Sequence, residues 1–166
     1  ATGTNQPLLT TEGILFDGID NWMKTANIGI VQPTQIYIVF KRVTYTFNVA
    51  LFDGFTSSYG FMALYSEMAS RIFAGTYSTL LTLPISKFVL SNVLFNAENS
   101  KFSINENAWS GDTGTRDMNA FTLGSGGSTT GSYSNVEIKE VIIRKVADSS
   151  DDVLLLNNYL KSKYAL

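Results

Sequence analysis

Apolar positions along the chain form short runs, separated by clusters of Gly, Asn, Ser and Asp. This pattern is typical of an all-β sandwich or barrel and differs from alternating βαβ units. The runs predict strands at residues 13–16, 22–25, 35–42, 47–52, 61–65, 71–74, 87–95, 101–104, 120–123 and 136–146. We therefore expect a two-sheet antiparallel jelly-roll sandwich.

The strand predicted at residues 35–42 is largely apolar on both faces up to its end. One face carries Ile36, Ile38 and Phe40, and the other carries Tyr37, Val39 and Lys41. Because successive side chains of a strand point to opposite faces, this strand is expected to be central.

The C-terminal segment has a different period. Val153, Leu156, Leu160 and Tyr164 recur at steps of three and four, with Leu155 and Tyr159 beside them. This spacing predicts a helix whose apolar stripe packs on the sandwich. Ser149 or Ser150 can cap its start, and acidic residues in its first turn suit the helix dipole.

The tetrapeptide Leu-Phe-Asp-Gly occurs at residues 15–18 and again at residues 51–54. The segments that follow differ, so the two copies do not indicate a repeated unit. In both, apolar residues lead into Asp-Gly, a pair suited to tight turns. We interpret each copy as the end of a strand.

Composition narrows the possible functions. The 166 residues suit one domain, and a net charge of −2 with a pI near 5.0 argues against nucleic acid as a partner. No segment predicts membrane insertion or export. The absence of Cys and His excludes thiolate nucleophiles, Ser-His pairs and imidazole metal sites. Because the chain starts without Met, we expect a processed product or a piece of a longer polypeptide.

Several stretches together resemble a known family. They are "QPLLTTEGILFDGIDNWMKT", "VQPTQIYIVFKRV" running to "ALFDG", "NAFTLGS" followed by "VEIKEVIIRKV", and "LLLNNYLKSKYAL". Their order resembles the laminin-G-like, concanavalin A-like domains of phage structural proteins and bacterial surface proteins. The resemblance covers nearly the whole chain and implies one jelly-roll domain over residues 1–166, with a C-terminal helix and a binding or structural role.

The same sandwich also occurs in polysaccharide hydrolases, whose paired carboxylates lie on one face of a strand. The nearest candidates here are Glu137 and Glu140. A step of three residues puts them on opposite faces unless the strand contains a bulge, and Lys139 stands where a central acid is needed. We therefore expect no enzyme, and we expect Glu140 to bond a neighbouring loop or backbone amide.

Two polar, Gly-rich segments, residues 105–119 and 124–134, are predicted to be long loops, which are functional or mobile. Asp112 and Asp117, with Asn105 and Asn107, could offer calcium ligands, although the same residues are common in turns. Trp109 has the aromatic face that sugar binding uses, although it could equally cover the core. The candidate ligand-binding set is Trp109, Asp112, Arg116, Asp117 and Tyr133.

These observations favour a non-catalytic binding module on a virion or cell surface. Its loops would face a glycan or a protein receptor, with neighbouring structural subunits or a homo-oligomer as further partners. The alternative is a purely architectural domain that decorates or cements a larger particle. A polysaccharide hydrolase ranks third.

Overall fold

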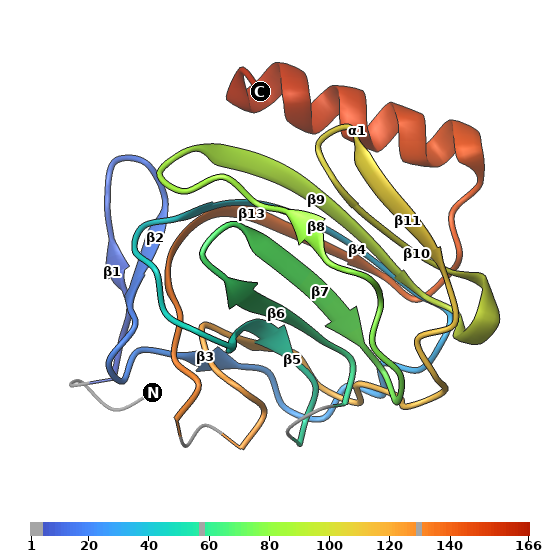
Figure 1. The fold of residues 1–166 in the computed structure, drawn as a ribbon, viewed down its shortest axis with the longest axis horizontal. Coiled ribbons are helices and arrows are strands. Elements are labelled where there is room, and N and C mark those ends of the chain that lie inside the picture. The colour runs from blue at the N-terminus through green and yellow to red at the C-terminus, as the bar shows by residue number, and fades with distance from the viewer. Residues whose placement is uncertain (1–4, 57–58, 129–130) are drawn as a thin grey trace.

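The computed structural model describes residues 5–56, 59–128 and 131–166 and shows two antiparallel β-sheets packed face to face (Figure 1). The seven-stranded sheet has the order β1 (Leu8–Leu9), β2 (Ile14–Asp17), β13 (Asn135–Arg144), β4 (Thr34–Arg42), β9 (Phe88–Phe95), β10 (Ser100–Ile104) and β11 (Asn107–Gly111). The six-stranded sheet has the order β3 (Met23–Lys24), β12 (Thr122–Leu123), β5 (Val49–Asp53), β6 (Phe61–Ser66), β7 (Ala69–Phe73) and β8 (Leu81–Thr82). A short 3₁₀ turn, η1 (Ala97–Asn99), and the helix α1 (Ser150–Tyr164) complete the elements.

The architecture confirms the predicted all-β, two-sheet antiparallel sandwich with a C-terminal helix. Each predicted strand overlaps a strand of the structure, but β1, β8 and β11 were missed. The prediction of one long loop over residues 105–119 is wrong, because β11 lies inside it and pairs with β10. Asn105 makes the tight turn between the two strands with a positive φ of 51°. As an exposed edge strand, β11 lacks the apolar alternation that marks a buried one.

The central strand β4 is buried on both faces, as its sequence predicts. Its inner face packs into the core between the sheets, where Ile36, Ile38 and Phe40 meet residues of the six-stranded sheet. On the outer face, Tyr37 and Val39 join Leu90 in a second apolar cluster. The sandwich therefore needs a cover on its outer side.

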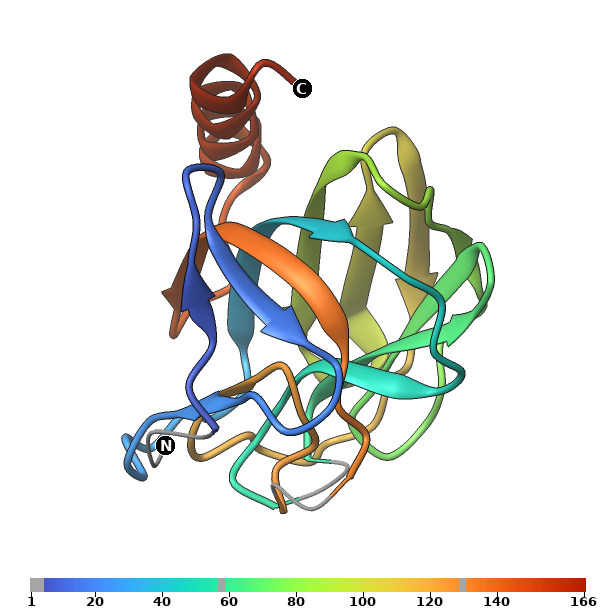
Figure 2. The same ribbon diagram turned by 90° about the vertical axis from the view of Figure 1, so that its left-hand side faces the viewer.

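Helix α1 provides this cover, crossing the outer side of the seven-stranded sheet (Figure 1) and appearing nearly end-on above it in Figure 2. The predicted stripe is confirmed: Leu160, with Val153, Leu156 and Tyr164, packs on the second cluster. Ser149 is the N-cap, and its side chain accepts a hydrogen bond from the backbone N–H of Asp152 at 3.2 Å. Among the described residues, no helix is long and apolar enough to cross a membrane.

Both Leu-Phe-Asp-Gly segments end strands, as the sequence predicts. The Oδ1 atom of Asp17, at the end of β2, accepts a hydrogen bond from the N–H of Ile19 at 2.8 Å. At the end of β5, Asp53 is buried, and its carboxylate joins three segments of chain. The backbone N–H groups of Gly54, Tyr59 and Gly127 donate to it at 2.7, 3.1 and 3.0 Å. Asp53 thus fixes the positions of two loops.

We expect Asp53→Asn to lower the free energy of unfolding by about 2 kcal/mol. The variant replaces one of the two accepting carboxylate oxygens with an NH₂ group, which cannot accept the backbone N–H bonds. The matched control is Asp17→Asn, an exposed residue in the same motif, which should cost less than about 1 kcal/mol. Urea denaturation of both variants measures the difference. Equal losses would contradict the role assigned to Asp53.

Candidate functional site

The sequence-predicted ligand-binding residues lie in three different surroundings. Trp109 is half-buried and packs against the main core, because it pairs with Phe102 on the inner side of β10 and β11. The chain beyond β11 contains Asp112, Arg116 and Asp117. Asp112 accepts a hydrogen bond from the N–H of Gly114 at 2.6 Å, which is ordinary turn geometry.

Arg116 and Tyr133 lie at the six-stranded sheet. The Arg116 guanidinium is 5.3 Å from the centre of the Phe73 ring of β7. Tyr133 follows Ser132, whose carbonyl oxygen accepts a hydrogen bond from the N–H of Ala50 in β5 at 3.1 Å. Tyr133 thus lies beside β5, whereas Trp109 is on β11, which contacts β8. In the six-stranded sheet, β6 and β7 separate β5 from β8. Trp109 and Tyr133 therefore do not form one site, and a ligand role for the five residues stays a prediction.

The calcium candidates are also separated. Asn105 and Asn107 lie at the start of β11, and Asp112 follows its end. Five residues of extended strand span about 17 Å, too far for one ion. Asp117 accepts a hydrogen bond from the backbone N–H of Gln32 at 2.8 Å. In the part of the chain that the structure describes, no group of three or more acidic side chains could hold a metal.

The position of the two strand glutamates corrects a second sequence-based expectation. The pairing of β13 with β4 shifts register between Ile138 and Glu140, which marks a β-bulge at Lys139. Glu137 consequently pairs with Lys41 and Glu140 with Val39, so both glutamates lie on the outer face of the sheet. The assumption of a regular strand was wrong, and the contacts of the two carboxylates decide their roles.

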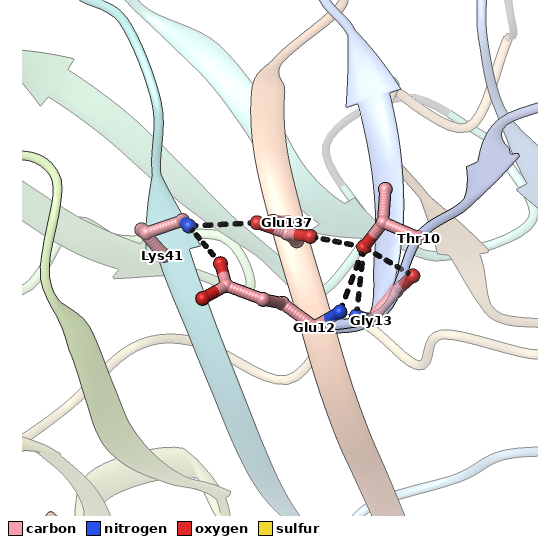
Figure 3. A network of polar contacts seen from close by, with 5 residues as sticks. All are labelled: Thr10, Glu12, Gly13, Lys41 and Glu137. Carbon is pink, nitrogen blue, oxygen red and sulfur yellow. Dashed lines mark hydrogen bonds and ion pairs between the residues drawn. The ribbon is translucent and has the colours of Figure 1, made fainter.

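Glu137 ties the hairpin of β1 and β2 to the sheet (Figure 3). Its carboxylate forms an ion pair with Lys41 at 2.7 Å and accepts a hydrogen bond from the Thr10 hydroxyl. Lys41 also contacts Glu12 at 2.6 Å. Burial raises the pKa of Glu137, but the hydrogen bonds from Lys41 and Thr10 outweigh burial and leave the pKa below its usual value.

Glu140 ties the end of α1 to the sheet. Its Oε2 atom accepts hydrogen bonds from Lys163 Nζ at 2.8 Å and from the Tyr164 hydroxyl at 2.7 Å. Burial raises the pKa of Glu140, whereas these hydrogen bonds lower it further than burial raises it. Neither strand glutamate has the raised pKa that suits a general acid at neutral pH. Glu140 bonds a helix rather than the expected loop.

We expect Glu137→Gln to lower the free energy of unfolding by about 1–3 kcal/mol at pH 7, because Lys41 and Thr10 lose a charged acceptor. Since the folded-state pKa is lowered, the stabilisation is present above the unfolded-state pKa of about 4.3 and is lost as the pH falls through the folded value. The stabilities of the wild type and of Glu137→Gln should therefore converge at low pH, and thermal unfolding from pH 7 to pH 2 measures this.

Glu12→Gln is the matched control for this pH series, since Glu12 contacts the same lysine but is more exposed. It should cost much less at pH 7. A constant difference between Glu137→Gln and the wild type at every pH would contradict the ionic contribution.

A cleft of about 490 Å³ lies between α1 and the outer face of the seven-stranded sheet. Strand register builds its floor from two rows of side chains, Gln35, Leu94, Lys101 and Ser110 in one, and Asn92, Ser103 and Ala108 in the other. From above, α1 contributes Ser150, Val153 and Asn157. This volume is in the range of pockets that bind small molecules.

Two amide side chains form the polar centre of the cleft. Gln35 Nε2 donates a hydrogen bond to Asn92 Oδ1. Within the described residues, the Gln35 carbonyl oxygen and the Asn92 NH₂ group have no other hydrogen bond. The Oδ1 atom of Asn157 is buried and also lacks a partner there. The cleft is thus lined by amide donors and acceptors that form no hydrogen bond with other described residues.

The charged residues of the cleft are few. Asp148 accepts a hydrogen bond from the Tyr37 hydroxyl at 2.7 Å and forms an ion pair with Arg144 at 3.1 Å. Burial and the Asp148 carboxylate together raise the pKa of Tyr37. Lys101 is exposed at the rim. This arrangement suits a neutral ligand that offers several hydroxyl or amide groups.

Of the sequence-predicted ligand residues, Trp109 is among the residues that line the cleft. Sequence reasoning missed the two amides at its centre, although a signal was present. Gln35 and Asn92 are buried amides in two strands that are mostly apolar, β4 and β9. A buried polar residue in such a strand needs a partner or a ligand. Strand order, which brings the two amides together, cannot be read from the pattern of either strand alone.

No protein-family model and no curated protein matches the chain. Among solved structures, Trypanosoma rangeli sialidase in complex with sialic acid is similar, with a TM-score of 0.71 and 12% identity over 93% of this chain and 28% of that one. A mutant of that sialidase displaying trans-sialidase activity has a TM-score of 0.68 and 10% identity over 89% of this chain and 27% of that one. The likeness shows a shared β-sandwich fold, and this chain spans little more than a quarter of the sialidase chains.

These matches correct the expectation that the protein is not an enzyme, because the similar solved structures are chains of glycosidases. The exclusion rested on a single chemistry, the pair of carboxylates on a strand. Sialidases are glycosidases that use a tyrosine nucleophile instead. The lack of a carboxylate pair therefore does not separate this chain from enzymes.

Proposed function

We propose that this chain is a carbohydrate-binding domain and that it binds sugar in the cleft beneath α1. The observation that carries the proposal is the Gln35–Asn92 pair in a cleft of about 490 Å³. Its free carbonyl oxygen and NH₂ group bond no other described residue. A sugar offers neighbouring hydroxyl groups that donate and accept at once, so an amide pair matches them.

The surroundings of the amide pair support the same ligand class. Leu94 and Val153 give the cleft apolar walls against which the C–H groups of a sugar ring can pack. Ser103 and Ser110 add hydroxyl groups from β10 and β11. The fold shared with a sialidase that was solved in complex with sialic acid supports a carbohydrate ligand as well, by analogy of fold.

Ala108→Trp should abolish or weaken glycan binding at least about tenfold, a change of about 1.4 kcal/mol, because an exposed small residue of the cleft becomes large enough to fill it. Binding is measured first on a glycan array and then by calorimetry with the best neutral oligosaccharide found.

The matched control is Leu8→Trp, an exposed position on β1 at the opposite edge of the same sheet. It should bind like the wild type, and thermal unfolding should show both variants folded. A glycan that the Ala108→Trp variant binds as tightly as the wild type would place carbohydrate binding outside the cleft.

The setting of the domain forms part of the proposal. The sequence resemblance supports a place on a virion or cell surface, with a host glycan or receptor as the partner. The sialidase matches support a place within a larger polypeptide, including one that carries a glycosidase domain. In either setting, the domain would hold the protein on a glycan-bearing surface.

One observation favours a second, architectural role. The outward side of α1 carries exposed apolar side chains, with Leu154 60% and Leu155 68% exposed. Such a stripe suits contact with a neighbouring subunit. Leu155→Glu should dissociate an assembly that light scattering detects in the wild type. The control Ser162→Glu, at another exposed position two helical turns away, should not. A wild type that stays monomeric at all concentrations would argue against self-assembly through α1.

A further inference from the structure

The outer face of the six-stranded sheet carries a cluster of aromatic side chains that no motif of the sequence indicated. Met62, Leu64 and Ile72 point into the core, so the residues that alternate with them in β6 and β7 face outward. The outward residues are Phe61, Tyr65, Arg71 and Phe73, and Tyr77 joins them from the segment after β7. An arginine therefore stands among aromatic rings on the solvent side of the sheet.

The Arg71 guanidinium lies between two tyrosine rings. Its central carbon is 3.8 Å from the centre of the Tyr65 ring and 3.7 Å from the centre of the Tyr77 ring. These distances are well within the range of a strong cation–π contact. The N–H groups of a guanidinium lie in its plane, so contacts with aromatic rings do not use them as hydrogen-bond donors.

The two rings are themselves held by neighbouring rings. Tyr77 packs against Phe73 with ring centres 4.5 Å apart, and Tyr65 packs against Phe47 at 5.1 Å. The guanidinium is thus preorganised by a group of packed aromatic side chains, which reduces the entropy lost when a ligand binds it.

The Arg71 side chain donates no hydrogen bond to any described residue. In the described part of the chain it has neither an ion pair nor a side-chain hydrogen bond, and its Nε atom is buried without a partner. Arg42 shows the ordinary alternative, because its terminal nitrogens donate to the backbone carbonyl oxygens of Ser66 and Thr46. A held guanidinium with unused donors is a binding group for a planar oxyanion.

The surroundings of Arg71 indicate which oxyanion fits. Tyr77 and Phe61 also line a small cleft of about 130 Å³, whose polar lining residues are Asn48, Ser132 and Asp53. The Asp53 carboxylate already accepts hydrogen bonds from three backbone N–H groups. Tyr77 is 46% exposed and can take the apolar face of a sugar ring, while Asn48 and Ser132 can bond hydroxyl groups. Arg116, 5.3 Å from the Phe73 ring, adds positive charge to the same face.

We infer that Arg71, clamped between Tyr65 and Tyr77, binds the carboxylate of an acidic sugar on the outer face of the six-stranded sheet. The inference rests on the proposed carbohydrate-binding function and extends it to a second site, on the sheet opposite the cleft, and to a ligand class that the amide-lined cleft does not select. The domain would thereby hold an acidic glycan by a charged group at one site and a neutral stretch at the other.

The test is a titration of the ¹⁵N-labelled protein followed by NMR at the Nε–H resonance of Arg71. The probes are sodium glucuronate, glucose as the matched sugar without a carboxylate, and acetate as a carboxylate without a ring. We expect glucuronate to shift the resonance saturably, glucose to leave it unchanged, and acetate to bind at least about tenfold more weakly than glucuronate. Equal binding of acetate and glucuronate, or no shift with glucuronate, would overturn the inference.

Three variants complete the test. Arg71→Lys keeps the charge but loses the planar fork, and should weaken glucuronate binding at least about tenfold. Arg71→Met should abolish it, with thermal unfolding as the check that the variant is folded. Ala108→Trp, which closes the other cleft, should leave glucuronate binding unchanged. If the wild type binds glucuronate but no neutral glycan, the proposed cleft site fails and the Arg71 site stands. If it binds a neutral glycan but not glucuronate, the Arg71 site fails and the cleft site stands.

Discussion

Strand β4 is apolar on both faces, and the need to bury both faces shapes the rest of the molecule. The inner face is covered by the second sheet, as in any sandwich. The outer face needs a separate cover, which α1 supplies over Tyr37 and Val39. Because a single helix is narrower than a seven-stranded sheet, it leaves part of β9, β10 and β11 uncovered. The cleft lies at that boundary.

Two glutamates of β13 attach the outer elements to this sheet. A bulge at Lys139 brings Glu137 and Glu140 to the same face, where one bonds the β1–β2 hairpin and the other bonds the end of α1. Both carboxylates are thereby used for attachment. Lys163 and Tyr164, at the end of the helix, are the partners of Glu140.

The two candidate binding sites differ in chemistry as well as in position. Between α1 and the seven-stranded sheet, amide groups with unused hydrogen-bonding capacity suit neutral hydroxyl groups. On the outer face of the six-stranded sheet, an arginine between tyrosine rings suits an anion. A β-sandwich can carry both because its two outer faces point in opposite directions, so that one domain can contact separate parts of an extended glycan.

The sequence by itself determined the fold class, the strands with clear apolar alternation, the capped helix and the strand-ending role of the two Asp-Gly pairs. These features depend on local periodicity and turn chemistry, which a single stretch of chain contains. Only the tertiary structure decided that β11 pairs with β10, that Glu137 and Glu140 share a face, and that Trp109 packs inward. It also brought Gln35 to Asn92 and Arg71 to Tyr77. Each of these depends on strand register and on neighbours distant in the sequence, so no local pattern could reveal it.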